Sequence, residues 1–258
     1  MTVRSLIFNV AFYVNLVVFM LVGMPGLFSR RATWAVSLGW CHASLWLLRS
    51  ICGTRVEMRG LENIPSGPLI VAAKHQSFLE TFAIVTAFEK PAYILKAELK
   101  LIPVFGWYMS ALGMVPVRRG KRSQAMRAMN EAATKHLDDG GQILIFVEGT
   151  RRPPGAEPQY KIGVTYMYEQ NTVPCLPVAL NTGLFWPRRK FMRYPGTAVI
   201  EFLPAIPPRA ERGELLDTLQ NGIESACDRL LVEAVRNDPE LPLNPEAEAR
   251  LAALGEAC

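Results

Sequence analysis

The apolar positions divide the chain into two unlike parts. The first 50 residues contain two long runs without formal charge, between Arg4 and Arg30 and from Ala32 to Leu48. Beyond Gly60, short apolar runs alternate with stretches that have apolar residues at helical spacing. The short runs predict strands at residues 69–73, 92–95, 114–117, 142–147, 175–180 and 198–203. The stretches between them predict helices at about 78–88, 103–111, 122–138, 161–170 and 212–236.

This alternation predicts the fold class and the domain organisation. Strands rich in Val, Ile and Leu that alternate with helices are typical of an α/β sheet covered on both faces. We expect membrane-associating helices over residues 1–50, one α/β domain over 51–237 and a tail over 238–258. The tail is rich in Pro, Glu and Ala, and it predicts one short helix or a frayed end.

The two uncharged runs predict attachment to a membrane. The first is long enough to span about 30 Å of hydrocarbon. It is also long for a cleavable signal peptide and lacks a small-x-small cleavage site. The second run carries Trp34, Trp40 and Trp46, which suit the membrane interface. A two-pass hairpin would export the Arg30-Arg31 pair, against the positive-inside tendency, so we favour a helical pair in one leaflet over a spanning pair.

Composition and charge narrow the class of protein further. Half of the 258 residues are apolar, which supports a sizeable core and excludes a disordered chain. The net charge is +5, and before residue 61 six Arg and Lys face one acid, Glu57. This bias favours a partner that carries phosphate, either a membrane surface or nucleic acid. The five cysteines are scattered and form no CxxC pair, so we expect reduced thiols and no metal site.

The segment KHQSFLE, residues 74–80, follows the apolar run LIVAA and carries the first candidate chemistry. His75 lies where a strand meets a helix, a common position for active-site residues in α/β proteins. Its imidazole can act as a general base, with the Glu80 carboxylate fixing its orientation. The alternative is a capping box, in which Ser77 caps the helix and Glu80 reaches back to the Ser77 N–H. The two interpretations are compatible.

Two further strand ends carry polar groups. After the strand at 142–147, the turn Glu148-Gly149-Thr150-Arg151 can present backbone N–H groups and a guanidinium to an anion. An ordinary turn with solvated arginines is the alternative. After the strand at 114–117 comes another basic pair. Because the ends of parallel strands share one edge of a sheet, we expect these groups to converge with His75.

Four segments resemble, in this order, the sequence blocks of the glycerolipid acyltransferases. They are KHQSFLE, GMVPVRR, FVEGTR and VPCLPV, and the resemblance covers about residues 55–205. It is nearest to the bacterial 1-acyl-sn-glycerol-3-phosphate acyltransferases. The first block usually ends in Asp in this family, whereas this chain has Glu80.

The resemblance implies a single acyltransferase domain with a mixed, mostly parallel sheet. It implies transfer of a fatty acyl group from acyl-CoA or acyl-carrier protein to lysophosphatidic acid, giving phosphatidic acid. His75 would be the base and Glu80 its orienting partner. The substrate-binding residues implied are Arg118, Arg119, Glu148, Gly149, Thr150, Arg151 and Lys161. Which of the two arginines at 118 and 119 contacts phosphate stays open, and Glu148 suits holding an arginine better than touching phosphate.

The resemblance further implies no cofactor, and a location at the cell inner membrane with the catalytic domain on the cytoplasmic side. The partners expected are the bilayer, lysophosphatidic acid and the acyl donor, with no nucleic acid. The segment WPRRKFMRY at residues 186–194 interleaves aromatics with cations, and we expect it to lie on anionic headgroups. Stacking on nucleic acid is the alternative for this segment.

Three other functions remain as alternatives. The same chemistry could serve another acceptor, namely glycerol 3-phosphate, another lysophospholipid or a lyso-aminolipid. A hydrolase would use Ser77 or Cys175 as its nucleophile, although the chain has no G-x-S-x-G motif. A basic membrane adaptor without catalysis would need none of the polar strand ends.

Overall fold

One mixed sheet organises the computed structural model, which describes residues 1–117, 122–208 and 214–256. Its strands are β1 (Thr54–Arg59), β2 (Leu69–Ala73), β3 (Pro91–Lys96), β4 (Val115–Val117), β5 (Gln142–Phe146), β6 (Cys175–Leu180) and β7 (Gly196–Phe202). Their order across the sheet is β1-β7-β6-β2-β5-β3-β4. Every pairing is parallel except that of β6 with β7. The predicted mixed, mostly parallel α/β sheet is therefore confirmed.

The strands expected from apolar runs all form, close to their predicted bounds. Strands β2 and β6 lie at the centre and are buried at every position, which explains their unbroken apolar sequences. Strand β1 was not predicted. Its sequence TRVEMR alternates polar and apolar residues, and it lies at the sheet edge, paired only with β7. An edge strand buries less of its surface, so the apolar signal is weak.

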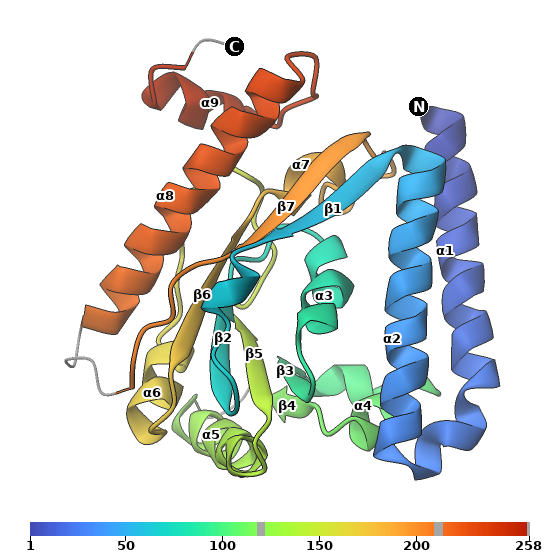
Figure 1. The fold of residues 1–258 in the computed structure, drawn as a ribbon, viewed down its shortest axis with the longest axis vertical. Coiled ribbons are helices and arrows are strands. Elements are labelled where there is room, and N and C mark those ends of the chain that lie inside the picture. Colours follow the sequence, from blue (N-terminus) through green and yellow to red (C-terminus); the bar gives the residue numbers. More distant parts are fainter. Residues whose placement is uncertain (118–121, 209–213, 257–258) are drawn as a thin grey trace.

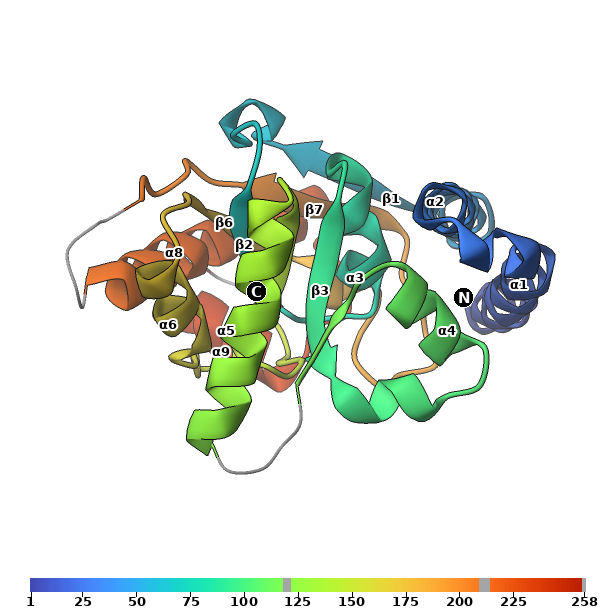
Figure 2. The same ribbon diagram turned by 90° about the horizontal axis from the view of Figure 1, so that it is seen from below.

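Helices cover both faces of the sheet (Figures 1 and 2). They are α3 (Leu79–Ala83), α4 (Phe105–Ala111), α5 (Arg122–Asp138), α6 (Gly163–Gln170), α7 (Thr182–Phe185), α8 (Glu214–Asn237) and α9 (Pro245–Ala253). Alternate residues of β2 point to opposite sides. Leu69 and Val71 pack with α3 and the N-terminal helices, whereas Ile70 and Ala72 pack with α5, α6 and α8.

The N-terminal segment is a helical hairpin, as predicted. Helix α1 (Thr2–Val22) and helix α2 (Arg30–Leu47) are joined by the short turn η1 (Met24–Phe28). Phe8 and Phe12 of α1 are buried against Trp186, with ring centroids 5.2 and 5.3 Å apart. Near the other end of α1, the Tyr108 hydroxyl of α4 donates to the Met20 carbonyl oxygen at 2.9 Å. Helix α1 therefore packs on the α/β domain along most of its length.

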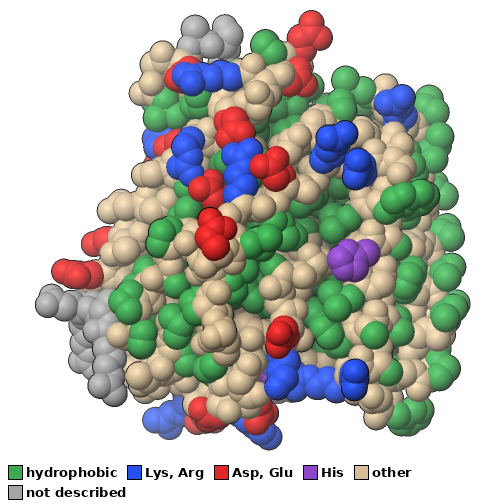
Figure 3. Space-filling model, in the orientation of Figure 1, with side chains coloured by type: hydrophobic (Ala, Val, Ile, Leu, Met, Phe, Trp, Pro, Cys, Tyr) green, Lys and Arg blue, Asp and Glu red, His purple; other side chains and the backbone are tan. Residues whose placement is uncertain are grey.

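The opposite face of α1 is exposed and apolar. Among the described residues, α1 is the helix that is long and apolar enough to cross a membrane. Hydrophobic side chains line the edge of the molecule that α1 forms, at the right of Figure 3. The exposed residues are Val3, Leu6, Ile7, Val10, Tyr13, Val14, Val17, Val18, Leu21 and Val22. An apolar surface of this length is not tolerated in water, so it indicates association with a membrane.

The topology brings the polar strand ends to one edge. Strands β2, β5, β3 and β4 run in the same direction, so their carboxyl ends meet on the same side of the sheet. The segments after β2 and β5 are directly hydrogen-bonded, because the Arg152 N–H donates to the His75 carbonyl oxygen at 2.9 Å. The fold thus joins the first and third candidate segments into one site.

Candidate active site

The loop between β2 and α3 carries His75, and the first turn of α3 carries Glu80. The Glu80 side chain is completely buried and folds back over the loop. Its Oε1 accepts hydrogen bonds from the backbone N–H groups of Gln76 at 2.8 Å and Ser77 at 2.7 Å. The carboxylate thereby closes the turn from strand to helix and holds the loop in one conformation.

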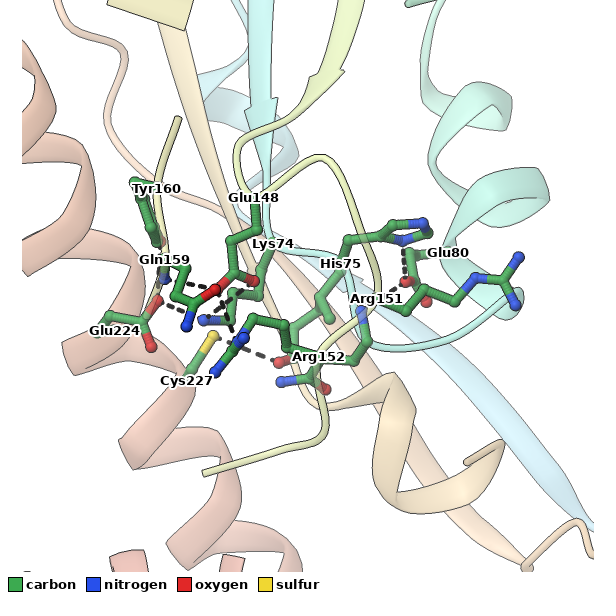
Figure 4. Close-up of polar contacts among 12 residues, drawn as sticks. Lys74, His75, Glu80, Glu148, Arg151, Arg152, Gln159, Tyr160, Glu224 and Cys227 are labelled. Carbon is green, nitrogen blue, oxygen red and sulfur yellow. Dashed lines mark hydrogen bonds and ion pairs between the residues drawn. The ribbon is translucent and has the colours of Figure 1, made fainter. Parts of the chain in front are cut away.

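The same oxygen, Glu80 Oε1, lies 2.8 Å from His75 Nδ1 (Figure 4). Two backbone N–H groups already donate to Oε1, so this oxygen acts as an acceptor and Nδ1 carries the ring proton. Nε2 then has a free lone pair, and among the described residues it has no hydrogen-bond partner. The other oxygen, Oε2, accepts a hydrogen bond from the Thr182 hydroxyl at 2.6 Å. Four donors therefore stabilise the ionised carboxylate.

The capping box predicted for Ser77 forms in part: α3 begins at Leu79 with Phe78 at the N-cap, and the Glu80 half of the box occurs together with the His–Glu pair. The Ser77 Oγ accepts the Leu79 N–H at 3.1 Å and donates to the Trp186 carbonyl oxygen at 2.6 Å. Glu80 returns a bond to the Ser77 N–H, as a capping box requires. The cap fixes the helix start, and the helix start fixes the carboxylate beside His75. Local structure and candidate chemistry therefore depend on the same side chain.

An aromatic platform sets the plane of the His75 ring. Phe146, the last residue of β5, stacks on the imidazole with 3.7 Å between centroids and 11° between planes. Tyr93 of β3 stacks in turn on Phe146 at 5.5 Å. With Nδ1 bonded and one ring face covered, the imidazole has a single orientation. Its side chain is 12% exposed, so a substrate can reach it from one side.

The turn after β5 lies beside the imidazole. Gly149 has φ 65°, a conformation that favours glycine, and its N–H closes the turn on the Phe146 carbonyl oxygen at 2.9 Å. The next two N–H groups, of Thr150 and Arg151, have no partner among the described residues. The Arg151 guanidinium lies 5.4 Å above the Phe78 ring. These donors can bind an anion close to His75.

Burial and charge act together on Arg151. Burial lowers the pKa of its guanidinium below the usual 12.5, while the nearby Glu80 charge opposes this change. An arginine stays protonated at neutral pH even with such a shift. Within the described parts of the chain, no carboxylate forms an ion pair with Arg151. The site therefore contains, beside the His–Glu pair, a cation without an ion-pair partner among the described residues.

Beneath the His75 loop lies a second, buried polar cluster (Figure 4). The Lys74 ammonium lies 2.6 Å from Glu224 Oε1 on α8 and 3.4 Å from Glu148 Oε2. The Tyr160 hydroxyl donates to Glu224 at 2.9 Å, and Arg152 Nε lies 3.7 Å from Glu148 Oε1. Burial raises the pKa of Glu148, and the Lys74 charge opposes this rise. These contacts fix the two segments that flank the site.

A cavity of about 260 Å³ adjoins this cluster on the side away from His75. It lies between α8, the chain after Arg152 and the region of Arg250, and Lys74, Gln76 and Glu224 contribute to its wall. His75 and Glu80 do not line it. The candidate chemistry therefore sits at an open edge of the sheet, and this cavity belongs to the supporting structure.

The remaining predicted site residues have different positions. Glu148 is buried below the turn, against cations of this chain. Thr150 is exposed on the turn. Lys161 donates its backbone N–H to the Val147 carbonyl oxygen at 2.8 Å, and its side chain is exposed. Arg118 and Arg119 lie outside the described residues, directly after β4.

Both nucleophiles of the hydrolase alternative are poorly suited to that role. Ser77 is fully buried, and its hydroxyl is bonded to the Leu79 N–H and the Trp186 carbonyl oxygen. Cys175 is fully buried in β6, and burial raises the pKa of its thiol to about 12. Because the thiolate is the reactive form of cysteine, this side chain is inert.

The sequence did not reveal several residues that shape the site. Thr182 contacts Glu80 from 102 positions away, and Glu224 reaches Lys74 across 150 positions. Neither residue belongs to a recognisable local motif. Phe146 stood within the segment FVEGTR, but an apolar residue at the end of a buried strand is normally a core residue. No sequence signal identified it as the platform for His75.

Comparisons with known proteins identify relatives of this chain. A family model described as Acyltransferase matches residues 55–181. The 1-acyl-sn-glycerol-3-phosphate acyltransferase of Pseudomonas aeruginosa is 34% identical over 194 residues, covering 75% of this chain and 76% of that protein. The human 1-acyl-sn-glycerol-3-phosphate acyltransferase alpha is 26% identical, covering 78% and 72%.

A solved structure matches over nearly the whole chain. The crystal structure of the 1-acyl-sn-glycerophosphate (LPA) acyltransferase PlsC from Thermotoga maritima superposes with a TM-score of 0.74 at 25% identity. The match covers 89% of this chain and 98% of that one. The mixed α/β sheet with its N-terminal helix pair thus has a structural counterpart in that protein. The chain belongs to the acyltransferase family.

Proposed function

We propose that this chain transfers a fatty acyl group from a thioester to the sn-2 hydroxyl of 1-acyl-sn-glycerol 3-phosphate, giving phosphatidic acid. The relatives from Pseudomonas aeruginosa and Thermotoga maritima carry this activity in their names. The observation that carries the proposal is the His75–Glu80 pair, in which Nδ1 is bonded and Nε2 is free. Such a histidine is suited to remove a proton from an alcohol.

The proposed step needs no covalent enzyme intermediate. His75 Nε2 takes the hydroxyl proton as the oxygen attacks the thioester carbonyl carbon. The tetrahedral intermediate then collapses, the carbon–sulfur bond breaks, and the imidazolium returns its proton to the leaving thiolate. Glu80 stays ionised and stabilises the imidazolium through Nδ1–H. Because a thioester is already activated, holding two substrates and one base in place supplies much of the rate.

Hydrogen-bond donors and a guanidinium are available for the two anionic groups of the reaction, the carbonyl oxygen of the intermediate and the acceptor phosphate. The N–H groups of Thr150 and Arg151 and the Arg151 guanidinium suit the negative charge on the carbonyl oxygen and on the acceptor phosphate. We further propose that Arg118, Arg119 and Lys161 assist in binding phosphate. Glu148 would hold Arg152 and Lys74 in place instead of touching substrate. The acyl donor is acyl-CoA or acyl-carrier protein.

The hairpin would deliver the membrane-embedded acceptor to this site. Helix α1 packs on the domain through Phe8 and Phe12, and its carbonyl oxygens accept hydrogen bonds from the Tyr108 hydroxyl. It would therefore have to separate from the domain to cross a bilayer. Its exposed apolar face suits burial in one leaflet with the helix parallel to the surface. We propose this arrangement at the cytoplasmic side of the inner membrane.

A panel of acceptors tests the proposed reaction. Purified chain receives a radiolabelled acyl donor with lysophosphatidic acid, glycerol 3-phosphate, lysophosphatidylglycerol or a lyso-aminolipid in separate reactions. We expect labelled phosphatidic acid from the first, and no product with His75→Ala, which should fold normally. Transfer only to another acceptor would refute the assigned substrate. A fully active His75→Ala variant would refute the assigned base.

Cysteine labelling tests the single-leaflet arrangement. Ser29 is exposed in the connection between α1 and α2, and the described native cysteines are buried. If the hairpin crossed the membrane, Ser29→Cys in spheroplasts would react with an impermeant maleimide from outside. We expect reaction only after the cells are lysed. The matched control is a cysteine in place of the exposed Arg127 of α5, which should show the same dependence on lysis.

A further inference from the structure

The segment between α7 and β7 is strongly basic, and the proposed mechanism assigns no role to its positive charges. Residues 186–193, WPRRKFMR, contain four cations and no acid. This cationic segment lies close to the turn after β5 that contains Gly149, Thr150 and Arg151, which we call the catalytic turn. The contact is direct, because Arg188 Nη1 donates to the Arg151 carbonyl oxygen at 2.6 Å. It therefore contacts the same residue whose guanidinium lies beside the His–Glu pair.

One of the four cations is structural. Arg193 is buried, lies 4.3 Å above the Trp186 ring, and donates through Nη1 to the carbonyl oxygens of residues 190, 191 and 192. Its Nη2 donates to Asn9 Oδ1 on α1 at 2.9 Å. Asn9 in turn donates to the Phe191 carbonyl oxygen at 3.1 Å. The cationic segment is thus fixed between the catalytic turn and the membrane-facing helix.

Arg188 and Arg189 are free to bind a ligand. Across residues 1–117, 122–208 and 214–256, no carboxylate lies within 4.0 Å of either guanidinium. Both are close enough to Arg151 for their charges to add to the lowering of its pKa, which burial dominates and Glu80 opposes. Three neighbouring like charges repel one another, and a bound anion relieves that repulsion.

The backbone at Arg189 supports a functional role for its side chain. Arg189 has φ 56°, in the left-handed region that glycine adopts readily and other residues adopt at a cost. If residue 189 served only to form the turn, glycine would adopt this conformation with less strain than arginine. Strained residues of this kind tend to occur where a ligand is bound.

We propose that Arg188 and Arg189, together with Arg151, bind the phosphate monoester of the acceptor lipid. The inference rests on the proposed function. A phosphate monoester near neutral pH carries a charge of about −1.5 to −2, more than one guanidinium can neutralise. The position of the cationic segment between the catalytic turn and α1 suits a headgroup that arrives from the membrane. Three guanidiniums would favour such a monoester over a phosphodiester, which carries one charge.

The test compares two variants with a matched control. Arg188→Gln removes one guanidinium and the bond to the Arg151 carbonyl oxygen. Arg189→Gly removes the other guanidinium and relieves the left-handed backbone, so its fold should be retained or stabilised. Arg127→Gln is the control, because Arg127 is exposed on α5 and has no ion pair among the described residues. Thermal unfolding verifies that each variant is folded.

Initial rates are measured in neutral detergent micelles with oleoyl-CoA and 1-oleoyl lysophosphatidic acid. We expect each variant to raise the KM for lysophosphatidic acid about tenfold or more, with the KM for oleoyl-CoA unchanged. The kcat of Arg189→Gly should stay close to wild type, whereas Arg188→Gln should also lower kcat by releasing the catalytic turn. Arg127→Gln should change none of these constants. In Arg189→Gly, residual transfer to lysophosphatidylglycerol should be unaffected, so the ratio of kcat/KM for lysophosphatidic acid to kcat/KM for lysophosphatidylglycerol should fall.

Three outcomes would overturn the inference. The first is an unchanged KM for lysophosphatidic acid in Arg189→Gly. The second is a KM that rises for oleoyl-CoA but not for oleoyl-N-acetylcysteamine, which would assign the cations to the phosphates of the donor. The third is weaker binding to anionic vesicles with unchanged kinetics in micelles. If Arg188→Gln does not fold, Arg188→Lys and Arg189→Gly decide the matter. Failure of the wild-type chain to acylate lysophosphatidic acid would instead refute the proposed function.

Discussion

Glu80 serves both the helix cap and the imidazole, and Glu80→Gln separates these two roles. The amide oxygen of Gln can still accept the N–H groups of Gln76 and Ser77, so the cap is retained. Its amide group has no charge to stabilise an imidazolium, and its NH₂ would take the place of Oε2 beside the Thr182 hydroxyl.

The structure sets the size of both effects. Two charges about 4 Å apart interact by about 4 kcal/mol at an effective dielectric constant of about 20, and His75 Nδ1 lies 2.8 Å from Glu80 Oε1. Each 1.4 kcal/mol or so is a factor of about ten in rate, so we expect kcat to fall by about a thousandfold. Two backbone bonds lose their charge assistance of about 1 kcal/mol each, so unfolding free energy should fall by at most about 2 kcal/mol.

Single-turnover transfer from radiolabelled acyl-CoA to lysophosphatidic acid measures the rate, and urea unfolding measures the stability. Thr182→Val is the matched control, because it removes one donor to Glu80 and leaves the charge. We expect its turnover to stay within about tenfold of wild type. If Glu80→Gln folds and retains near-normal turnover, Glu80 is only a cap and the assigned pair is wrong.

Three further predictions concern the supporting structure. Phe12→Ala should lower the free energy of unfolding by about 3–5 kcal/mol in detergent, because the ring is buried among aromatics, whereas Tyr13→Ala, exposed on the same helix, should change little. Lys74→Met should cost about 3 kcal/mol by leaving buried carboxylates unpaired, and adding Glu224→Gln should recover part of that loss. Burial lowers the pKa of His136 below its usual 6.5, so the unfolded chain takes up this proton first as the pH falls. Stability should therefore decline below about pH 6.5, and His136→Gln should make that decline shallower, as measured by Tm against pH.

Each of these three predictions would be contradicted by a specific result. Equal losses from Phe12→Ala and Tyr13→Ala would mean that the hairpin does not pack on the domain as described. A double variant less stable than Lys74→Met alone would show that Glu224 does not depend on this cation. An unchanged pH profile for His136→Gln would show that another group titrates in this range.

Local signals in the sequence determined the elements and the main candidates. The apolar runs predicted the central strands, because full burial leaves an unbroken apolar pattern. They also predicted the hairpin, because the exposed face of α1 is apolar as well. The S-x-x-E spacing of Ser77 and Glu80 predicted the cap, and the placement of His75 before it predicted the base. These features depend on residues a few positions apart, so they can be predicted from the sequence alone.

Only the tertiary structure decided how the site is completed. Sheet order puts β5 beside β2, so Phe146 becomes the platform for His75, and it brings Thr182 to the second oxygen of Glu80. Docking of α1 through Phe12 decided that the exposed apolar face of α1 points away from the domain. Contacts between residues a hundred positions apart leave no local pattern in the sequence, because a strand or helix can form whichever distant residue it later contacts. Which of them meet depends on how the elements pack, and packing is a property of the whole chain.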